Sequence, residues 1–250
     1  MEIEDITADY GETKQTFALP AVGPNLYWEV GQKILEQGRK VPIGDYTAPL
    51  VHALYCDTNN QGIKERFEEV IRSKGGLYVF NRNIWTSNGV YVIQDSEVDA
   101  LQQLRGNSEK VRLWDLKQLI EQGGNEIKGV RFSKDGKIRF ASKDSFLVGE
   151  VDSQRVAEDG CVIANYGING ARLLSNVASK LSGSAHLHSL DIEDQFCGCR
   201  RPLDFEDRVA SLSIQDNKLH IYGVRRNGSD GRGDMKSSSF GISINEGKEK

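Results

Sequence analysis

The sequence predicts an α+β protein in which a helix-rich N-terminal part packs with antiparallel hairpins. Apolar residues recur at helical spacing up to Gly75, and alternating strand patterns separated by turn residues begin at Leu77. Only one strand-loop-helix unit stands out, at residues 161–181, whereas a parallel sheet needs several. An α/β fold with a mixed sheet is therefore the alternative.

Three helices are expected in the N-terminal part. Gly38 and Gly75 end the first and the last of them. The apolar faces of these two helices are Tyr27, Val30, Ile34 and Leu35, and Ile63, Phe67, Val70 and Ile71. Between them Thr47 is expected to cap a short helix that runs to Cys56. Pro49 agrees with this start, because a helix tolerates proline in its first turn.

A hairpin is predicted for residues 77–93, with its two strands separated by Ser-Asn-Gly at 87–89 and Asn88-Gly89 taken as the turn. Both of its faces carry large apolar side chains, a pattern typical of a sheet that is covered on both sides. The two faces consist of Val79, Trp85, Val90 and Val92, and of Tyr78, Phe80, Ile84 and Tyr91. A further helix is expected over residues 113–120, ended by the glycines 123 and 124.

The hairpin between residues 130 and 140 has two candidate registers. A two-residue turn would place Phe132 opposite Arg139 and so mix apolar and charged groups on one face. A three-residue turn with Gly136 left-handed would pair Phe132 with Ile138 and Val130 with Phe140. The second register is predicted, because it keeps the apolar residues together.

The predicted register places Arg131 opposite Arg139, with Lys137 beside them. Like charges across a strand pair destabilise it by up to about 1 kcal/mol unless an anion relieves them. These residues are therefore a candidate site for an anionic small molecule or an acidic protein partner. The alternative is a solvated face whose charge is offset by acids such as Glu126 or Glu150.

The strand-loop-helix unit supplies a second candidate anion site. Cys161 to Ala164 is a continuous apolar run that predicts a buried strand, and Gly167 and Gly170 lead into a helix. Free amides at a helix N-terminus favour anions. The alternative is that the glycines only let a strand turn into a helix.

The last third of the chain is predicted to hold a strand near residues 185–190, a hairpin and a final strand near 240–244. The hairpin turns at Asp216-Asn217 and pairs Ile214 with Leu219. Residues 227–239 predict a long loop, because they are rich in glycine, serine and charge.

Four side chains near the strand at 185–190 form a candidate zinc site: His186, His188, Cys197 and Cys199. The histidines alternate and would share one strand face, while Cys-Gly-Cys would add two thiolates. The one-residue gap between the cysteines is shorter than structural zinc sites usually have. Exposed histidines and unligated thiols are the alternative.

A second pair, His52 and Cys56, would share one helix face and could act as metal ligands or as a thiol with its base. A half-buried helix with a small apolar cysteine is the simpler interpretation. Nucleophile-elbow, zinc-protease, kinase and phosphate-loop motifs are absent from the sequence. Whether the chain is an enzyme is left open by these patterns.

Composition limits the function classes. The chain has 250 residues, a net charge of -4 and a mean hydropathy of -0.48, which is ordinary for a folded protein. An acidic balance disfavours nucleic acid as a partner. Four sparse cysteines favour reduced thiols, and neither an export signal nor a membrane span is predicted, so a cytoplasmic location is expected.

Two domains are expected, a helical region plus first hairpin at 1–125 and a hairpin-rich region at 126–250, with a single domain over 1–250 as the alternative. The leading functional hypothesis is a non-enzymatic protein that binds an anionic ligand or acidic partner. One alternative is a metal-dependent hydrolase or zinc-stabilised enzyme. The other is a structural or assembly protein that uses the hairpin near Trp85 as an interface.

Overall fold

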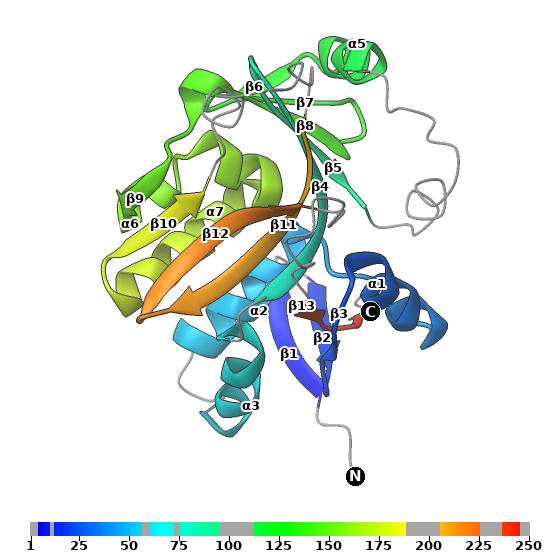
Figure 1. Ribbon diagram of the computed structural model, residues 1–250, viewed down its shortest axis with the longest axis vertical. Coiled ribbons are helices and arrows are strands. Elements are labelled where there is room, and N and C mark those ends of the chain that lie inside the picture. The colour runs from blue at the N-terminus through cyan, green and yellow to red at the C-terminus, as the bar shows by residue number, and fades with distance from the viewer. Residues whose placement is uncertain are drawn as a thin grey trace, which may run out of the picture.

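The computed structural model describes residues 5–10, 13–56, 61–72, 76–95, 113–188, 206–225 and 237–245. They form an α+β protein, as predicted, around a large mixed sheet (Figure 1). In spatial order its strands are β6 (Asn125–Ile127), β7 (Val130–Phe132), β8 (Ile138–Ser142), β5 (Gly89–Gln94), β4 (Leu77–Thr86), β11 (Glu206–Gln215), β12 (Lys218–Arg225), β10 (Ser184–His188) and β9 (Gly149–Asp152). Most neighbours are antiparallel, whereas β10 and β12 are parallel. The sheet thus joins strands from both sides of residue 125.

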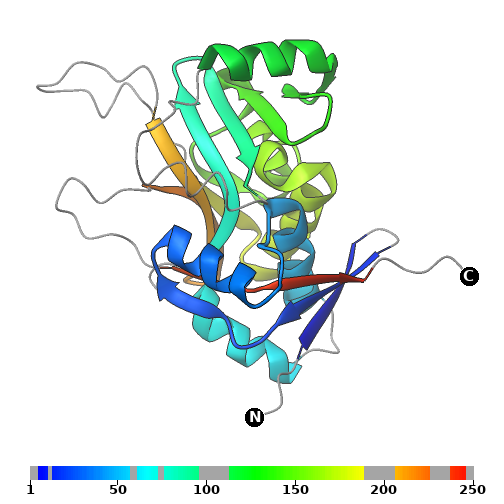
Figure 2. The same cartoon turned by 90° about the vertical axis from the view of Figure 1, so that its right-hand side faces the viewer.

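A smaller sheet brings the two ends of the described chain together. It consists of β1 (Asp5–Tyr10), β2 (Thr13–Ala18) and β14 (Ile242–Asn245), with β2 in the middle. Figure 2 shows the red β14 lying against the blue N-terminal strands. Next to it, β13 (Ser237–Ser239) links β3 (Val22–Asn25) to β4 of the large sheet.

The expected helices at both ends of the first region are confirmed as α1 (Tyr27–Glu36) and α3 (Gln61–Ile71), and the later one as α5 (Leu113–Gly123). The middle helix, α2 (Gly44–Cys56), begins earlier than predicted. Thr47 does not cap it, because its hydroxyl donates to the Ile43 carbonyl oxygen at 3.0 Å. Pro49 consequently lies in the second turn of α2 rather than in its first.

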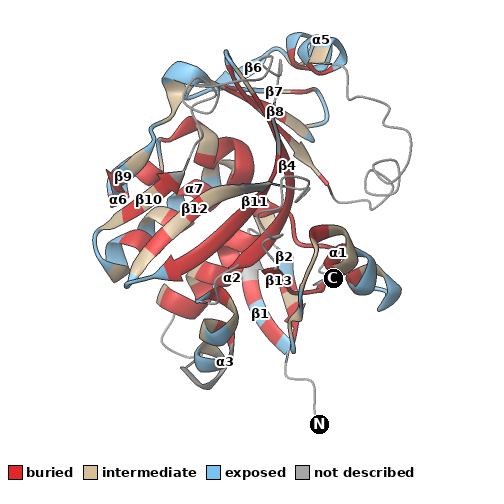
Figure 3. Cartoon of the chain, in the orientation of Figure 1, coloured by how far each residue is buried: buried red, intermediate tan, exposed pale blue. Residues whose placement is uncertain are grey.

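The core lies on both faces of β4, which confirms the two-sided hairpin. One face packs Val79, Trp85 and Val90 against α2 and α7 (Gly160–Leu181), and the other packs Tyr78 and Phe80 against α1. Figure 3 shows the buried residues concentrated along this central layer. The turn occupies residues 87 and 88, one position earlier than assumed. The resulting two-residue shift in pairing leaves every side chain on its predicted face.

The predicted strand at residues 161–164 is wrong, because these residues form the first turn of α7. The Asp159 carboxylate caps this helix by accepting a hydrogen bond from the Val162 N–H at 3.0 Å. A short apolar run does not by itself distinguish a buried strand from a buried helix. The chain therefore has no strand-loop-helix unit here: the short helix α6 (Ser153–Val156) precedes α7, and Gly167 is a kink inside α7.

The predicted register of the hairpin at 130–140 is also wrong. Phe132 lies opposite Arg139, and Arg131 lies opposite Phe140, which is the register that mixes apolar and charged groups. The two arginines consequently lie on opposite faces of the sheet. By contrast, the hairpin at Asp216-Asn217 is confirmed, with Ile214 opposite Leu219. No helix in the described part of the chain is long and apolar enough to cross a membrane.

Candidate functional site

Arg139 lies on the buried face of its hairpin, where an acid from another part of the chain pairs with it. Its guanidinium donates to both oxygens of Asp45 on α2, at 2.8 and 2.6 Å, and to the Ala164 carbonyl oxygen at 3.3 Å. The side chains of Arg139 and Asp45 are 7% and 16% exposed. Asp45 thus neutralises Arg139 from within the chain, whereas the sequence argument for an external anion depended on an Arg131–Arg139 pairing that the structure does not have.

Gly167, from the other predicted anion site, lies against the same carboxylate. Its backbone has φ 71° and ψ 168°, and a Cβ added there would lie 3.3 Å from an Asp45 oxygen. Only glycine adopts this conformation readily, so the residue lets α7 kink around Asp45. The fold therefore brings Arg139 and Gly167 together. They surround the Asp45 carboxylate of the chain itself and do not form an open anion-binding site.

The other predicted anion-site residues lie apart from this pair. Arg131 is exposed, has its guanidinium 4.9 Å from the Phe140 ring centroid, and occupies the register position opposite Glu126. Lys137 is exposed in the hairpin turn, and Gly170 lies inside α7. The described structure does not gather these residues into one site.

The predicted zinc cluster is described only in part. His186 and His188 lie on β10, whereas Cys197 and Cys199 fall outside the described residues. The structure places another histidine, His220 of β12, directly beside His186, with the ring centroids 5.4 Å apart. The sequence patterns did not reveal this neighbour, because the parallel pairing of β10 with β12 has no local signal.

The remaining candidates have ordinary structural surroundings. His52 and Cys56 are half-buried one turn apart on α2, where Cys56 packs against the core. Trp85, the proposed assembly interface, is 3% exposed and packs edge-to-face on Phe146. That interface is therefore wrong, since the chain itself covers this hairpin.

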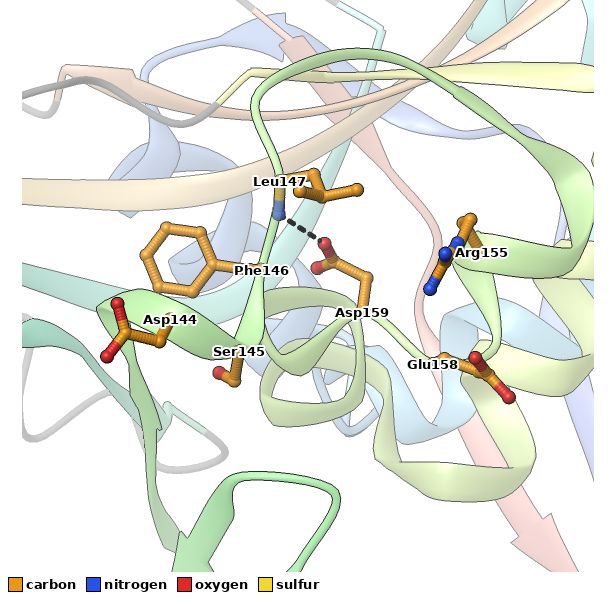
Figure 4. A pocket seen from close by; sticks show the side chains of 7 residues that line it. All are labelled: Asp144, Ser145, Phe146, Leu147, Arg155, Glu158 and Asp159. Atoms are coloured by element: carbon orange, nitrogen blue, oxygen red, sulfur yellow. Dashed lines mark hydrogen bonds between the residues drawn. The ribbon is translucent and has the colours of Figure 1, made fainter.

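A cavity of about 210 Å³ that sequence reasoning missed opens between the short helix η1 (Lys143–Ser145) and the start of α7. Seven residues line it: Asp144, Ser145, Phe146, Leu147, Arg155, Glu158 and Asp159. The lining thus holds three carboxyl groups and one guanidinium, and Figure 4 shows Asp159 between Asp144 and Glu158, whose carboxyl groups point outward on either side. The Asp159-Gly160 pair before the apolar run at 161–164 was the sequence signal for a helix start at this place, since aspartate commonly caps a helix.

Asp159 is held at the base of this cavity by backbone groups. Its second oxygen accepts the Leu147 N–H at 2.8 Å, which fixes the loop before β9 to the helix start. Gly160 permits this contact, because a Cβ there would lie 2.1 Å from the Ser145 hydroxyl. Burial raises the pKa of Asp159 to about 6, although hydrogen bonds from the Leu147, Val162 and Cys161 amides oppose the shift.

Exposed apolar side chains adjoin the cavity. Leu147 and Val148 are 52% and 61% exposed, and Phe146 between Leu147 and η1 is half-buried. On the other side, the Lys128 ammonium lies 4.0 Å from a Glu158 oxygen. The arrangement combines a small, carboxyl-rich cavity with exposed apolar side chains at its edge.

Comparison with known proteins supplies one likeness. No protein-family model and no curated protein matches the chain. A solved structure described as "Accommodation of massive sequence variation in Nanoarchaeota by the C-type lectin fold" aligns with a TM-score of 0.52. The alignment covers 95% of this chain and 100% of that chain, at 9% identity. The likeness shows the fold alone.

Proposed function

We propose that this chain is a non-enzymatic binding protein that holds a basic side chain of a protein partner in the cavity above Asp159. The observation that carries the proposal is the lining itself, which contains three carboxyl groups and one arginine. Above pH 6 the Asp159 carboxyl is mostly ionised, and the excess of carboxyl groups over the one guanidinium in the lining favours a cation. The proposed ligand charge is thus opposite to the one that the sequence patterns had suggested.

The size of the cavity supports a side chain rather than a whole small molecule. Its volume of about 210 Å³ lies below the roughly 300–1,000 Å³ of pockets that enclose drug-sized ligands. Leu147 and Val148 offer exposed apolar area beside it, as the surroundings of an interface anchor do. Arginine is the basic residue most enriched at such interfaces.

The fold is compatible with this role. The solved structure that shares it is described as a C-type lectin fold that accommodates massive sequence variation. We carry that property to this chain as part of the proposal, because a fold that accommodates sequence variation suits a binding module. Fold alone does not specify a ligand, so the cavity carries the argument.

Selection of a random peptide library displayed on phage, against the immobilised full chain, tests the proposal. Enriched peptides are expected to contain arginine or lysine next to apolar residues. Their affinity for the Asp144→Asn, Glu158→Gln double variant is expected to fall at least tenfold, and Val148→Asp is expected to weaken them too. The matched control, Glu65→Gln and Glu69→Gln on the exposed side of α3, is expected to bind as the native chain does.

Any of three results would count against the proposal. One is enrichment of peptides that lack a basic residue. A second is equal binding to the native chain and to the double variant. The third is a library that yields no specific binder.

A further inference from the structure

Two histidines lie side by side on the face of the large sheet that is turned away from α7. On β10, Ala185 and Leu187 belong to the core that includes α7. Because side chains alternate along a strand, His186 between them lies on the opposite face. Its neighbour on β12, His220, lies between the core residues Leu219 and Ile221 and so shares that face. Both histidines are half-buried.

The strand pairings put these residues in one cross-strand row. His186 is registered with His220 on one side and with Glu150 of β9 on the other. Ser213 of β11 follows His220 in the same row. The row depends on the parallel contact between β10 and β12, which joins segments 34 residues apart in the sequence (220 − 186). Figure 1 shows β9, β10, β12 and β11 running beside one another.

The separation of the two rings matches a shared metal ion. Their centroids are 5.4 Å apart and their planes are inclined by 34°. A zinc–nitrogen distance of about 2.0–2.1 Å places two imidazole centroids on a tetrahedral ion roughly 5 Å apart. The observed separation is therefore close to that of two imidazoles on one ion.

The surroundings favour the ligand form of imidazole. Burial, followed by the neighbouring His186, lowers the pKa of His220, so the neutral ring that binds metals is favoured near pH 7. A hydrogen bond with the Gln215 backbone acts in the opposite direction, as expected where a ring N–H donates to a carbonyl oxygen. Such a bond commonly fixes the tautomer and orientation of a metal-binding histidine.

An ion pair of a carboxylate and an ammonium lies beside the two histidines. Glu150 accepts hydrogen bonds from the Lys218 ammonium at 2.7 Å and the Ser184 hydroxyl at 2.9 Å, both through the same oxygen. The Lys218 contact is the main cause that lowers the pKa of Glu150, which keeps it ionised at neutral pH. Within the described part of the chain, no group of three or more His, Cys, Asp or Glu residues is placed to hold one ion.

We propose that His186 and His220 form a two-imidazole site for a divalent transition-metal ion such as Zn²⁺ or Cu²⁺. Solvent fills the remaining coordination positions, so the ion exchanges readily. Cu²⁺ binds more tightly than Zn²⁺, in keeping with the general order of divalent affinities. The site differs from the predicted zinc cluster, because His220 takes the place of the cysteine pair and of His188.

Titration of the full chain, purified without a histidine tag, tests this site. Calorimetry with Zn²⁺ and electron paramagnetic resonance with Cu²⁺ are expected to show one ion per chain with two nitrogen ligands. His186→Gln and His220→Gln are each expected to weaken binding at least tenfold. His52→Gln on α2 is the matched control and is expected to leave binding unchanged, and near-ultraviolet circular dichroism of the metal-free variants checks that they fold.

Two further variants separate this site from the predicted cluster. His188→Gln and the Cys197→Ser, Cys199→Ser double variant are expected to retain most of the affinity. The inference would be overturned if either of these variants lost metal binding while His220→Gln kept it. Absence of stoichiometric metal binding to the native chain would overturn it as well. If a histidine variant does not fold, metal protection of His186 and His220 from diethyl pyrocarbonate in the native chain decides: protection supports the site, and equal modification with and without metal rejects it.

Discussion

Replacing Arg139 by methionine is expected to destabilise the protein far more than the same change at Arg131. The methionine keeps an apolar stem of similar length and removes the guanidinium. Arg139 donates to both oxygens of Asp45 from a side chain that is only 7% exposed. Arg131, from the same hairpin, is exposed and only stacks on Phe140.

The magnitude follows from what each change leaves behind. The Asp45 side chain is only 16% exposed in the native chain, and replacing Arg139 leaves its carboxylate without its bidentate partner. Removing one member of a buried ion pair costs about 3–5 kcal/mol of unfolding free energy. For a chain of this size that corresponds to a fall in Tm of roughly 6–20 °C. The exposed Arg131 is expected to contribute less than about 1 kcal/mol.

Urea unfolding followed by circular dichroism measures both variants. The double variant Arg139→Met, Asp45→Asn is expected to be more stable than Arg139→Met alone, because it no longer buries an unpaired charge. A loss below about 1 kcal/mol for Arg139→Met, equal to that of Arg131→Met, would refute the buried-pair reasoning. So would a double variant whose loss is the sum of the two single losses.

Two further predictions concern the start and the kink of α7. The pKa of Asp159 is raised from 3.8 to about 6, so between these pH values the folded state keeps a proton that the unfolded state releases. The free energy of unfolding therefore falls as pH rises, and the full loss, reached above pH 6, is about 3 kcal/mol. Asp159→Asn keeps a capping oxygen but does not titrate, so urea unfolding between pH 4 and pH 7 is expected to show this variant gaining stability relative to the native chain as pH rises. A difference in unfolding free energy that stays constant with pH would contradict the raised pKa of Asp159. Gly167→Ala is expected to cost about 2–3 kcal/mol in unfolding free energy, because a glycine-only backbone conformation and the nearby Asp45 both oppose a Cβ. Gly124→Ala is the matched control, because Gly124 has the same φ of 71° and open space around it. If thermal unfolding shows the same loss of stability for both variants, Asp45 makes no contribution to the cost at Gly167.

The features that the sequence predicted correctly are those encoded by neighbouring residues. Helical spacing identified α1 and α3, and Asp216-Asn217 identified a hairpin whose register the structure confirms. Both of these turn residues have positive φ, of 50° and 59°, as the two-residue turn requires. The α+β class followed from these local signals.

The candidate sites depended on contacts that local patterns do not contain. The hairpin register was predicted by matching apolar side chains, which assumed that Arg139 faces solvent. Asp45, 94 residues away, instead pairs with Arg139 on the buried face, and this contact is compatible with the register that cross-strand matching disfavours. Both the predicted hairpin register and the expectation of an external anion thus overlooked the same long-range ion pair between Arg139 and Asp45.

By itself the sequence determined the helices α1 and α3 and the tight turn at Asp216-Asn217, because spacing and backbone preferences act within a few residues. Only the tertiary structure decided which charged groups are buried together and which histidines meet. His186 and His220 are neighbours because β10 and β12 pair in parallel, and Asp159 lies in a cavity because α7 begins beside η1. These arrangements arise from packing between distant segments, whose free energy is shared among many contacts and is not written in any short stretch of the chain.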